Sequence, residues 1–332
     1  MRIGTHQIGL GKPVFIIAEA GINHNGNILI AKKMIKKASE CGVDAIKFQT
    51  IFPEELFSKS LNSNLYDFAK TLSFSKKQHL ELKKYAKKNT IEFFSTPLGK
   101  KSTDLLDEIG VKIMKIASGE LTNHELIKII AKKRKPIFLS TGMATISEIR
   151  DAVKIIKKFR CPLAILHCNS SYPTPVEDAN LSTIHYFQNL FKVPIGYSDH
   201  TLGNDACLIA VSLGACIIEK HFTLDKEMKG PDQKLSADFE EFSELVNRIR
   251  YFEKSIGSPR KGPTKSEILP RKLMRKSIGA EVDIPAGTKL TKQMLCLIRP
   301  GTGISPTEMN HIVGKKIQKN IKKGKLLQWT MF

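Results

Sequence analysis

The stretch 193–201, VPIGYSDHT, joins a short apolar run to three consecutive polar residues, Ser198, Asp199 and His200. Seven further short runs, rich in Val, Ile and Phe, also end on polar residues. Helical patterns lie between them, which is typical of parallel β-α units. Eight such units predict an α/β chain with a (β/α)₈ barrel, the TIM-barrel fold. The expected strands are 14–21, 45–50, 91–97, 111–118, 136–142, 163–170, 194–200 and 216–222.

The intervals between these runs predict the surrounding helices. The last one, 238–255, begins at an Asp238 cap and stops before Gly257, a residue type favoured just beyond helix ends. Residues 51–74, which follow the second strand, are expected to form an extended loop. The other expected helices are 28–40, 76–89, 124–133, 146–158 and 203–213.

A change in composition divides the chain. Residues 257–272, GSPRKGPTKSEILPRK, are rich in Pro, Gly and basic residues and indicate a linker between the barrel domain, 1–256, and a small domain, 273–332. The small domain holds an internal repeat of turn-and-strand type, because 283–290 (DIPAGTKL) matches 320–327 (NIKKGKLL). A segment of about 60 residues buries a small fraction of its surface and is only marginally stable alone. This mainly-β segment is therefore expected to dock on a barrel, its own or a neighbour's.

The composition is that of an ordinary soluble protein, with 41% hydrophobic and 26% charged residues over 332 positions. The amino-terminal sequence lacks the basic-then-apolar layout of a secretory signal, and no apolar run approaches the ~18 residues of a membrane span. Six cysteines occur without a Cys-x-x-Cys pair, which fits a reduced compartment. A cytoplasmic protein is expected.

The net charge of +21 raises the question of nucleic-acid binding. Ten of the 53 basic residues are arginine, and the lysines are spread in pairs over predicted helix surfaces. Such a spread is typical of solvated helix faces. A positive field also raises the local concentration of anionic small molecules. Anionic substrates are therefore the favoured partners, and neither nucleic acid nor membrane is expected.

Polar side chains close every predicted strand. The carboxyl-terminal rim of a (β/α)₈ barrel is where catalytic groups lie, whatever the chemistry. Eight polar endings therefore argue for a site at this rim. The residues are Glu19, Lys47, Gln49, Ser95, Thr96, Lys115, Ser118, Ser140, Thr141, His167, Asn169, Ser198, His200, Glu219 and His221.

Two histidines at this rim suggest a metal site. Because alternate residues of a strand face the same side, His200 and His221 both face the barrel axis, whereas Asp199 points outward. Two imidazoles converging from adjacent strands could hold a divalent metal in a nitrogen and oxygen site with open positions. The alternative is that either histidine is a hydrogen-bonded core residue. The carboxylates expected nearby are Glu19, Glu219 and Asp232.

Lys47 and Lys115 bring positive charge to the rim, beside hydroxyl groups at positions 95, 96, 118, 140 and 141. Buried oxyanions need several donors and fixed positive charge, so this set is suited to a phosphate and a carboxylate. Two alternatives stay open. Either lysine could extend to water, and Lys115 could form a Schiff base with a carbonyl substrate.

Eight motifs follow one another along the barrel: AEAGINHNG (18–26), IKFQT (46–50), KIASGEL (115–121), LSTGMAT (139–145), HCNSSYPTP (167–175), GYSDHTLG (196–203), EKHFTLD (219–225) and GPDQKLSAD (230–238). Together they closely resemble the sialic acid synthase family. The carboxyl-terminal RKSIGAEVDIPAGTKLT and LIRPGTG (297–303) resemble the antifreeze-like (SAF) domain, a β-clip fold, that closes these enzymes. The resemblance spans almost the whole chain.

This resemblance implies a transferase that condenses phosphoenolpyruvate with an N-acetylated mannosamine-type sugar. The products would be a nine-carbon sialic acid, as in an N-acetylneuraminate synthase, and phosphate. It implies a divalent metal on His200 and His221, Mn²⁺ or else Mg²⁺ or Co²⁺, that polarises the open-chain aldehyde for attack by C3 of phosphoenolpyruvate. Glu19 would position or deprotonate the water that attacks C2.

The resemblance also assigns the remaining site residues. The catalytic residues are expected to be Glu19, Lys115 and Glu219. Phosphate and carboxylate binding is assigned to Lys47, Thr96, Lys115, Ser118, Ser140 and Ser198. Tyr172 and Asp232 would line the sugar pocket, Ser170 and Arg299 would be further substrate-binding residues, and Glu120 would support the residues that contact the substrate.

Two features bear on assembly and on the sugar. In the family, the counterpart of Arg299 reaches the sugar N-acetyl group of the other protomer, which implies a domain-swapped homodimer. Some members carry Asn two places before Tyr172, where this chain has Ser170. The sugar is therefore open between N-acetylmannosamine and 2,4-diacetamido-2,4,6-trideoxymannose, the precursor of legionaminic acid. A pseudaminic acid synthase is not favoured, because its first motif usually departs from GINHNG (21–26).

Two other functions remain as alternatives. A metal-free Schiff-base aldolase would let borohydride trap a substrate on Lys115. A non-catalytic polyanion-binding or ice-binding protein would draw on the charge and the antifreeze-like segment. Salt-sensitive retention on nucleic acid, or thermal hysteresis without turnover, would favour that second alternative.

Overall fold

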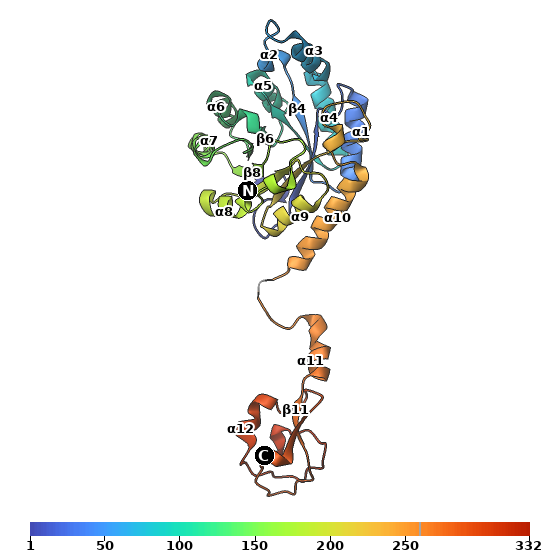
Figure 1. The fold of residues 1–332 in the computed structure, drawn as a ribbon, viewed down its shortest axis with the longest axis vertical. Helices are drawn as coiled ribbons and strands as arrows, with labels where there is room; N and C mark the ends of the chain where they lie inside the picture. The colour runs from blue at the N-terminus through green and yellow to red at the C-terminus, as the bar shows by residue number, and fades with distance from the viewer. Residues whose placement is uncertain (259) are drawn as a thin grey trace. The chain divides into compact units, whose positions relative to one another are not determined.

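The eight predicted strands are present in a computed structural model, which describes residues 1–258 and 260–332. They form one parallel sheet in the order β5-β4-β3-β10-β9-β8-β7-β6. β6 lies beside β5, so the barrel is nearly closed (Figure 1). No ladder hydrogen bond joins β5 to β6 among the residues described. The strands are β3 (Phe15–Gly21), β4 (Ala45–Thr50), β5 (Glu92–Pro97), β6 (Met114–Ile116), β7 (Ile137–Ser140), β8 (Leu163–Cys168), β9 (Ile195–Asp199) and β10 (Ile217–His221).

The strand β6 is much shorter than the predicted 111–118. Residues beyond Ala117 turn into a short 3₁₀ helix, Ser118–Glu120, in which the Leu121 amide donates to the Ser118 carbonyl. The polar pattern of this segment therefore reflects a turn at the rim rather than a continued strand. The other strands end within two residues of their predicted limits.

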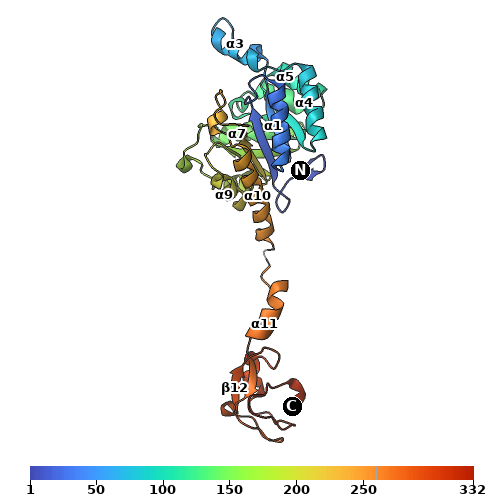
Figure 2. The ribbon, with the colours of Figure 1, turned by 90° about the vertical axis from the view of Figure 1, so that its right-hand side faces the viewer.

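Eight helices surround the sheet, and Figure 2 shows α1 beside α4 on its outer surface. Side-chain caps fix several of their starts, as when Asp238 accepts from the Glu241 amide and the Glu241 side chain accepts from the Asp238 amide. No helix of the described residues is both long and apolar enough to cross a bilayer. The helices are α1 (Ile28–Glu40), α4 (Lys76–Lys88), α5 (Lys100–Glu108), α6 (His124–Lys132), α7 (Ile146–Lys158), α8 (Thr183–Phe191), α9 (Asp205–Ser212) and α10 (Phe239–Ile256).

The expectation of an extended loop over 51–74 is wrong. Asn62 caps a helix there by accepting a hydrogen bond from the Leu65 amide at 3.1 Å. Ala69 and Leu72 of this helix pack on Ile51 in a small apolar cluster of their own. That burial stabilises a segment which the barrel pattern does not include. The two helices are α2 (Pro53–Leu56) and α3 (Ser63–Leu72).

The α2–α3 segment is attached to the barrel at two points. Glu55 accepts hydrogen bonds from the Ser102 amide at 3.1 Å and from the Ser102 hydroxyl at 2.8 Å, at the amino end of α5. At the other point, a Cβ on Gly26 (φ +70°) would lie 1.9 Å from the carbonyl oxygen of Thr71. The loop after β3 and the end of α3 therefore touch backbone to backbone, which only a glycine permits.

The chain divides into two compact units, Met1–Gly257 and Ser258–Phe332. Part of the predicted linker 257–272 is helical, because α11 (Ile268–Met274) begins inside it after a capping box between Thr264 and Glu267. Residue 259 of the predicted linker lies outside the described residues.

In the second unit, the internal repeat becomes a pair of facing segments. Ile284 and Ile321 exchange two backbone hydrogen bonds of 2.8 Å each. Both isoleucines belong to a hydrophobic cluster made of second-unit residues alone. The strands and the remaining helix of this unit are β11 (Ser277–Ala280), β12 (Leu295–Ile298) and α12 (Met309–Ile312).

Candidate functional site

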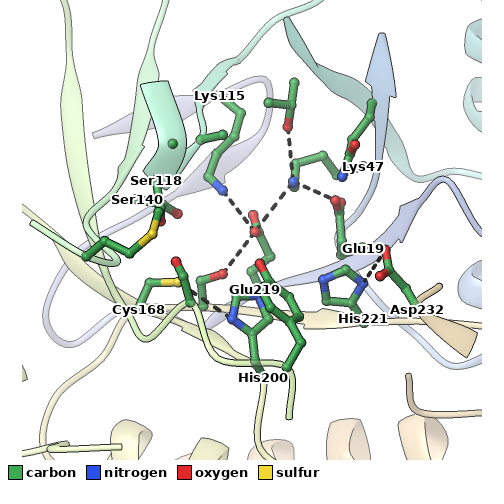
Figure 3. Close-up of a pocket in the computed structure, with 18 of the residues that line it drawn as sticks. Glu19, Lys47, Lys115, Ser118, Ser140, Cys168, His200, Glu219, His221 and Asp232 are labelled. Atoms are coloured by element: carbon green, nitrogen blue, oxygen red, sulfur yellow. Dashed lines mark hydrogen bonds and ion pairs between the residues drawn. The ribbon is translucent and has the colours of Figure 1, made fainter. Parts of the chain in front are cut away.

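A cavity of about 490 Å³ opens at the carboxyl ends of the barrel strands (Figure 3). The residues to which the resemblance gave a catalytic, substrate-binding or metal-binding role meet there, with two exceptions, Glu120 and Arg299. Since these residues come from eight different strands or the loops that follow them, the barrel itself brings them together. Those that line the cavity are Glu19, Lys47, Thr96, Lys115, Ser118, Ser140, Ser170, Tyr172, Ser198, His200, Glu219, His221 and Asp232.

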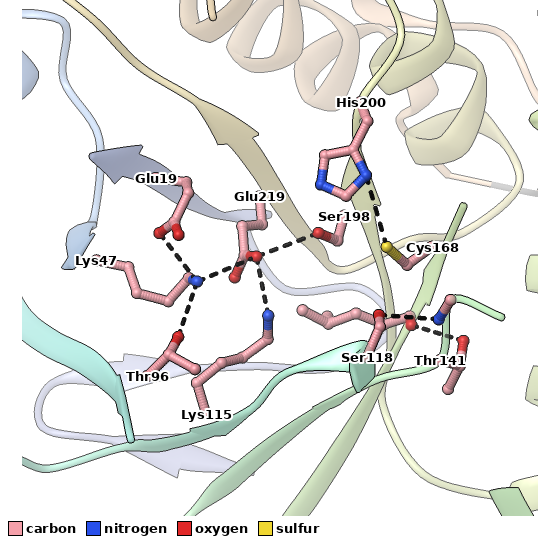
Figure 4. Close-up of polar contacts among 12 residues, drawn as sticks. Glu19, Lys47, Thr96, Lys115, Ser118, Thr141, Cys168, Ser198, His200 and Glu219 are labelled. Carbon is pink, nitrogen blue, oxygen red and sulfur yellow. Dashed lines mark hydrogen bonds and ion pairs between the residues drawn. The ribbon is translucent and has the colours of Figure 1, made fainter. Parts of the chain in front are cut away.

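Two lysines and two glutamates form a buried group of charges at the floor of this cavity (Figure 4). The Lys47 ammonium lies 2.9 Å from Glu19 Oε2 and 3.5 Å from Glu219 Oε1. Lys115, reaching across from β6, donates to the same Glu219 oxygen at 2.9 Å. Ser198 also donates to that oxygen, at 3.1 Å. Glu219 is therefore held by three donors, and Glu19 by Lys47.

The two glutamates differ in proton affinity. Burial raises the pKa of Glu19 to about 7, because the attraction of Lys47 compensates only in part and the charge of Glu219 adds to the rise. Burial acts on Glu219 in the same direction, but Lys115 and Lys47 lower its pKa to about 2. At neutral pH Glu219 is ionised, whereas Glu19 can take up or release a proton. A general base needs this property, and Glu19 has it.

Hydroxyl groups line the side of the cavity next to Lys115. Ser118 Oγ accepts from the Gly142 amide at 2.9 Å, and a Cβ on Gly142 would lie 2.2 Å from Ser170 Oγ. The absence of a side chain at Gly142 lets the serines approach one another. Ser140 Oγ is buried and has no hydrogen-bond partner among the described residues. These donors could receive the oxygens of an anionic ligand.

Two predicted members of the hydroxyl set lie elsewhere. Ser95 faces the helices and bonds Thr50 Oγ1 at 2.7 Å, while Thr50 bonds His79 at 3.0 Å. Thr141 donates to the carbonyl of Leu166 at 2.9 Å. Neither residue lines the cavity, so their inclusion is wrong, and both are satisfied structural groups.

His200 and His221 face the same cavity, and their ring centroids are 5.3 Å apart (Figure 3). His200 Nδ1 lies 2.5 Å from the carbonyl oxygen of Asn169, to which it can donate, and this leaves Nε2 for another ligand. His221 Nδ1 is buried without a hydrogen-bond partner among the described residues, and the nearest carboxylate oxygen, on Asp232, is 3.9 Å away. Asp199 points away from the cavity, as predicted.

The two imidazoles fit a divalent metal. Burial, with the neighbouring charge of His200 adding, holds the pKa of His221 well below its usual range, so this ring is neutral and able to bind a cation. The pKa of His200 is instead raised: burial lowers it, but the Cys168 thiol and the Asn169 carbonyl outweigh that effect. No cluster of three or more His, Cys, Asp or Glu side chains suited to a metal occurs within 1–258 or 260–332. A metal here would take its other ligands from water or substrate.

Tyr172 covers the two histidines. Its ring centroid lies 4.1 Å from that of His200 and 6.0 Å from that of His221, and half of its surface is exposed. An aromatic ring over this part of the cavity offers an apolar contact for a ligand that enters beside the histidines.

Glu120 and Arg299 are not part of the cavity lining. Glu120 accepts a hydrogen bond from Asn123 Nδ2 at 2.8 Å, next to the start of α6. Arg299 lies in the second unit, where its Nε donates to the carbonyl of Met274 at 2.9 Å. The roles expected of these two residues stay predictions.

Sequence reasoning missed several cavity residues, of which Cys168 is the most informative. It pairs in the sheet with Ser198, whose side chain faces the cavity, so the same alternation turns Cys168 inward. Its neighbour His167 points outward to the carbonyl of Ala179 at 2.8 Å. Gln49, one of the predicted polar strand ends, also lines the cavity, whereas Leu98, Ala117, Gly119 and Met143 are lining residues that were not predicted.

Two family models match the chain, one for each unit. The NeuB family matches residues 34–261, and the SAF domain matches residues 275–332. The first match covers more than half of the chain and contains most of the cavity lining.

Similar proteins span nearly the whole chain. An uncharacterized protein of Methanocaldococcus jannaschii is 47% identical over 330 residues, covering 99% of this chain and 97% of that one. The N,N'-diacetyllegionaminic acid synthase of Legionella pneumophila is 40% identical, covering 98% and 96%. The pseudaminic acid synthase of Campylobacter jejuni is 36% identical, covering 99% and 98%. The crystal structure of an N-acetylneuraminic acid synthetase from Leptospira borgpetersenii in complex with citrate has a TM-score of 0.77 and 41% identity, covering 81% of this chain and 94% of that one.

Proposed function

Because this chain belongs to the NeuB family and is a sugar-acid synthase, we propose that it condenses phosphoenolpyruvate with an N-acetylated mannosamine-type sugar. The products are a nine-carbon 2-keto sugar acid and phosphate. The observation that carries the proposal is the cavity in which Lys47 and Lys115 lie beside two inward-facing histidines. One part of this cavity suits an anion, and the other suits a cation and a carbonyl oxygen.

Different residues of the cavity lining have different roles in the proposed reaction. Lys47, Lys115 and the hydroxyls of Ser118 and Ser140 bind the phosphate and carboxylate of phosphoenolpyruvate, which orients its C3 toward the aldehyde carbon of the open-chain sugar. The C2–C3 double bond of phosphoenolpyruvate supplies the new carbon–carbon bond, which leaves C2 cationic, and the aldehyde oxygen takes up a proton to become a hydroxyl. Water then adds to C2 and Glu19 accepts a proton from this water. The C2 hydroxyl loses its remaining proton to give the keto group as phosphate leaves with its bridging oxygen.

His200 and His221 would hold a divalent metal, for which Mn²⁺ is the first candidate and Mg²⁺ or Co²⁺ are alternatives. When bound, the ion supplies polarisation of the sugar aldehyde. The buried, unpartnered Nδ1 of His221 and the open side of the His200 ring support this assignment. Tyr172 lies over both rings and would cover the sugar.

Two sugars remain as candidates. N-Acetylmannosamine is the first, supported by likeness to the N-acetylneuraminic acid synthetase structure at 41% identity. The second is 2,4-diacetamido-2,4,6-trideoxymannose, favoured by two N,N'-diacetyllegionaminic acid synthases that are 40% and 41% identical over nearly the whole chain. Ser170, with its shorter side chain than asparagine, leaves room on the sugar side of the cavity.

Phosphate release tests the reaction. It is expected when phosphoenolpyruvate, the sugar and a divalent metal are all present, and mass spectrometry of the products identifies the sugar from a panel of acetamido hexoses. Equal release without sugar, or in EDTA, contradicts the proposal. Trapping of a substrate on Lys115 by borohydride would instead support the Schiff-base aldolase.

The variant Glu19→Gln tests the base. Loss of the proton acceptor is expected to lower kcat by about 10²–10⁴-fold. Because the base works in its ionised form and the pKa of Glu19 is about 7, kcat of the unaltered enzyme should rise with pH through that value, and the residual activity of the variant should not. Glu54→Gln, at an exposed carboxylate that pairs with Lys101, is the control and should keep full activity. A variant that retains the same pH rise would exclude Glu19 as the base.

Arg299→Ala tests the contribution of the second unit and, with it, the domain-swapped homodimer. If this arginine of one protomer reaches the sugar held by its partner, the KM for the sugar should rise about tenfold or more, as for a lost charged contact, while the KM for phosphoenolpyruvate stays nearly unchanged. Arg248→Ala, at an exposed arginine of α10, is the matched control. An equal change in both KM values would contradict the assignment.

A further inference from the structure

A buried ion pair lies directly behind the two histidines. The parallel ladder between β9 and β10 ends with Lys220 opposite Asp199. The next residues along each strand are His221 and His200. Beyond the ladder, the two chain segments form hydrogen bonds with other parts of the protein. The His221 carbonyl accepts from the Ala237 amide, and the His200 carbonyl accepts from the Thr174 amide. Backbone pairing therefore does not fix one histidine against the other.

The side chains of Asp199 and Lys220 make that connection. Lys220 Nζ lies 2.6 Å from Asp199 Oδ2, and it also donates to the carbonyl of Thr201 at 2.9 Å. Since Asp199 and Thr201 are the residues on either side of His200, one ammonium group of β10 binds both flanks of that histidine, through the Asp199 carboxylate and the Thr201 backbone carbonyl. His221, adjacent to Lys220, is fixed to the same point.

The ion pair is fully enclosed and its carboxylate is fully bonded. The side chains of Lys220 and Asp199 expose 3% and 0% of their surface. Asp199 Oδ1 accepts from the Tyr197 hydroxyl at 3.0 Å and from the Thr201 amide at 2.8 Å, and Cys207 donates to Oδ2 at 3.2 Å. An ion pair without solvent contact contributes little net stability, because desolvation offsets the attraction. Its place directly behind the two histidines fits a positioning role.

We propose that Asp199 and Lys220 are positioning residues that set the separation of His200 and His221 for metal binding. This inference rests on the proposed function, because it concerns the same pair of imidazoles. Neither residue lines the cavity, and both act through the chain next to each histidine. Groups behind metal ligands commonly control affinity in this way.

The double variant Asp199→Asn/Lys220→Met tests the proposal. It removes both buried charges together and nearly keeps their volume, so no unpaired charge is left inside. The folded protein is expected to bind Mn²⁺ about 10–100-fold more weakly than the unaltered protein, as for other residues behind metal ligands. Affinity is measured by titration with Mn²⁺ alone, using the electron paramagnetic resonance signal of the free ion, and folding is measured by thermal unfolding in EDTA.

A second ion pair provides the matched control. Asp44 and Arg250 lie 3.0 Å apart at the amino ends of the strands, where Asp44 also accepts from the Ile16 amide at 2.8 Å. Asp44→Asn/Arg250→Met should lower stability but leave Mn²⁺ affinity within about twofold, since this pair lies behind no metal ligand. If both double variants lose Mn²⁺ affinity in proportion to their stability, the Asp199–Lys220 pair has a structural role only, and the proposal is overturned.

Two further variants separate the possible failures. Asp199→Asn alone keeps an oxygen acceptor for Tyr197 and Thr201, and serves if the double variant does not fold; a partial loss of Mn²⁺ affinity is expected. Wild-type affinity in either folded variant overturns the proposal, provided that His221→Ala no longer binds Mn²⁺. If His221→Ala binds Mn²⁺ like the unaltered protein, the metal site of the proposed function is itself wrong, and this inference fails with it.

Discussion

Individual buried groups in this protein carry unusual proton affinities, and His24 is the plainest example. It is fully buried in the loop after β3, where its ring stacks on Phe74 at 4.3 Å between centroids and its Nδ1 accepts from the Gly26 amide at 3.0 Å. Burial, with the charge of His79 adding, lowers the pKa of His24 to about 4. His24 and His79, whose pKa is also lowered by burial, are therefore neutral in the folded protein at physiological pH.

This burial predicts a loss of stability in acid. An unfolded histidine has a pKa near 6.5, so between about pH 6.5 and pH 4 the unfolded chain binds more protons than the folded one. The stability that depends on a neutral His24 is fully present above pH 6.5 and is lost as the pH falls toward 4. This loss in the free energy of unfolding amounts to about 3 kcal/mol. Urea unfolding over this pH range should show a weaker dependence for His24→Gln than for the exposed control His185→Gln. Identical pH dependence in both would contradict the assignment.

At the scale of residues, the sequence predicted which side chains face the cavity better than it predicted their chemistry. Strand alternation placed Glu219 and His221 inward and Asp199 outward, and the structure agrees. The opposite pKa shifts of Glu19 and Glu219 depend on Lys115 reaching across the barrel from a distant strand. Such a distance follows from packing and cannot be obtained from the order of residues.

Among the secondary-structure elements, the contact between the loop after β3 and α3 predicts how much stability the variant Gly26→Ala loses. Gly26→Ala forces an L side chain into a left-handed backbone and against the Thr71 carbonyl. The left-handed conformation should cost about 1 kcal/mol, and the steric overlap about 1–3 kcal/mol more. We expect lower stability in urea and faster proteolysis within residues 51–74.

A second glycine separates these two costs. Gly11 has a similar backbone angle, φ +73°, but a Cβ there meets no atom within 4 Å. Gly11→Ala should therefore show the backbone cost without the overlap. If both variants lose the same stability and neither gains protease sensitivity in 51–74, the proposed attachment of α3 at Gly26 is incorrect.

The elements predicted best are those whose pattern is regular. The helices 28–40 and 146–158 have the limits expected from their apolar periodicity and caps. The helices within 51–74 were not predicted, because the apolar residues of this segment form a cluster apart from the barrel core. These helices are stabilised by that local cluster and do not belong to the repeating β-α pattern. Similarly, β6 ends early because Ser118 begins a turn.

On the scale of the whole molecule, each unit has its own hydrophobic cluster. The core of the first unit draws on residues before Gly257, and that of the second on residues after Ser258. A fragment of residues 1–257 is therefore expected to fold with a melting temperature within a few degrees of the corresponding transition of the full chain. It should bind phosphoenolpyruvate normally and lose sugar affinity, because Arg299 is absent. Calorimetry and binding titrations check both outcomes.

A fragment that fails to fold would show that the barrel depends on the second unit. The barrel and the internal repeat of the second unit could be predicted because both are periodic in the sequence. The assignment of Arg299 to a partner's sugar rests on the family resemblance alone, because that contact depends on how protomers assemble and no periodicity within one chain encodes it.

The missing ladder between β5 and β6 has a consequence for the loaded enzyme. Thr96 belongs to one of these strands and Lys115 to the other, and both line the same cavity. An anion held by both would bridge the two strands where the backbone leaves them unjoined. Amide deuterium uptake in 92–97 and 114–116 would then fall on ligand binding. The β5–β6 side of the barrel would therefore open least when substrate is bound and most when substrate is absent.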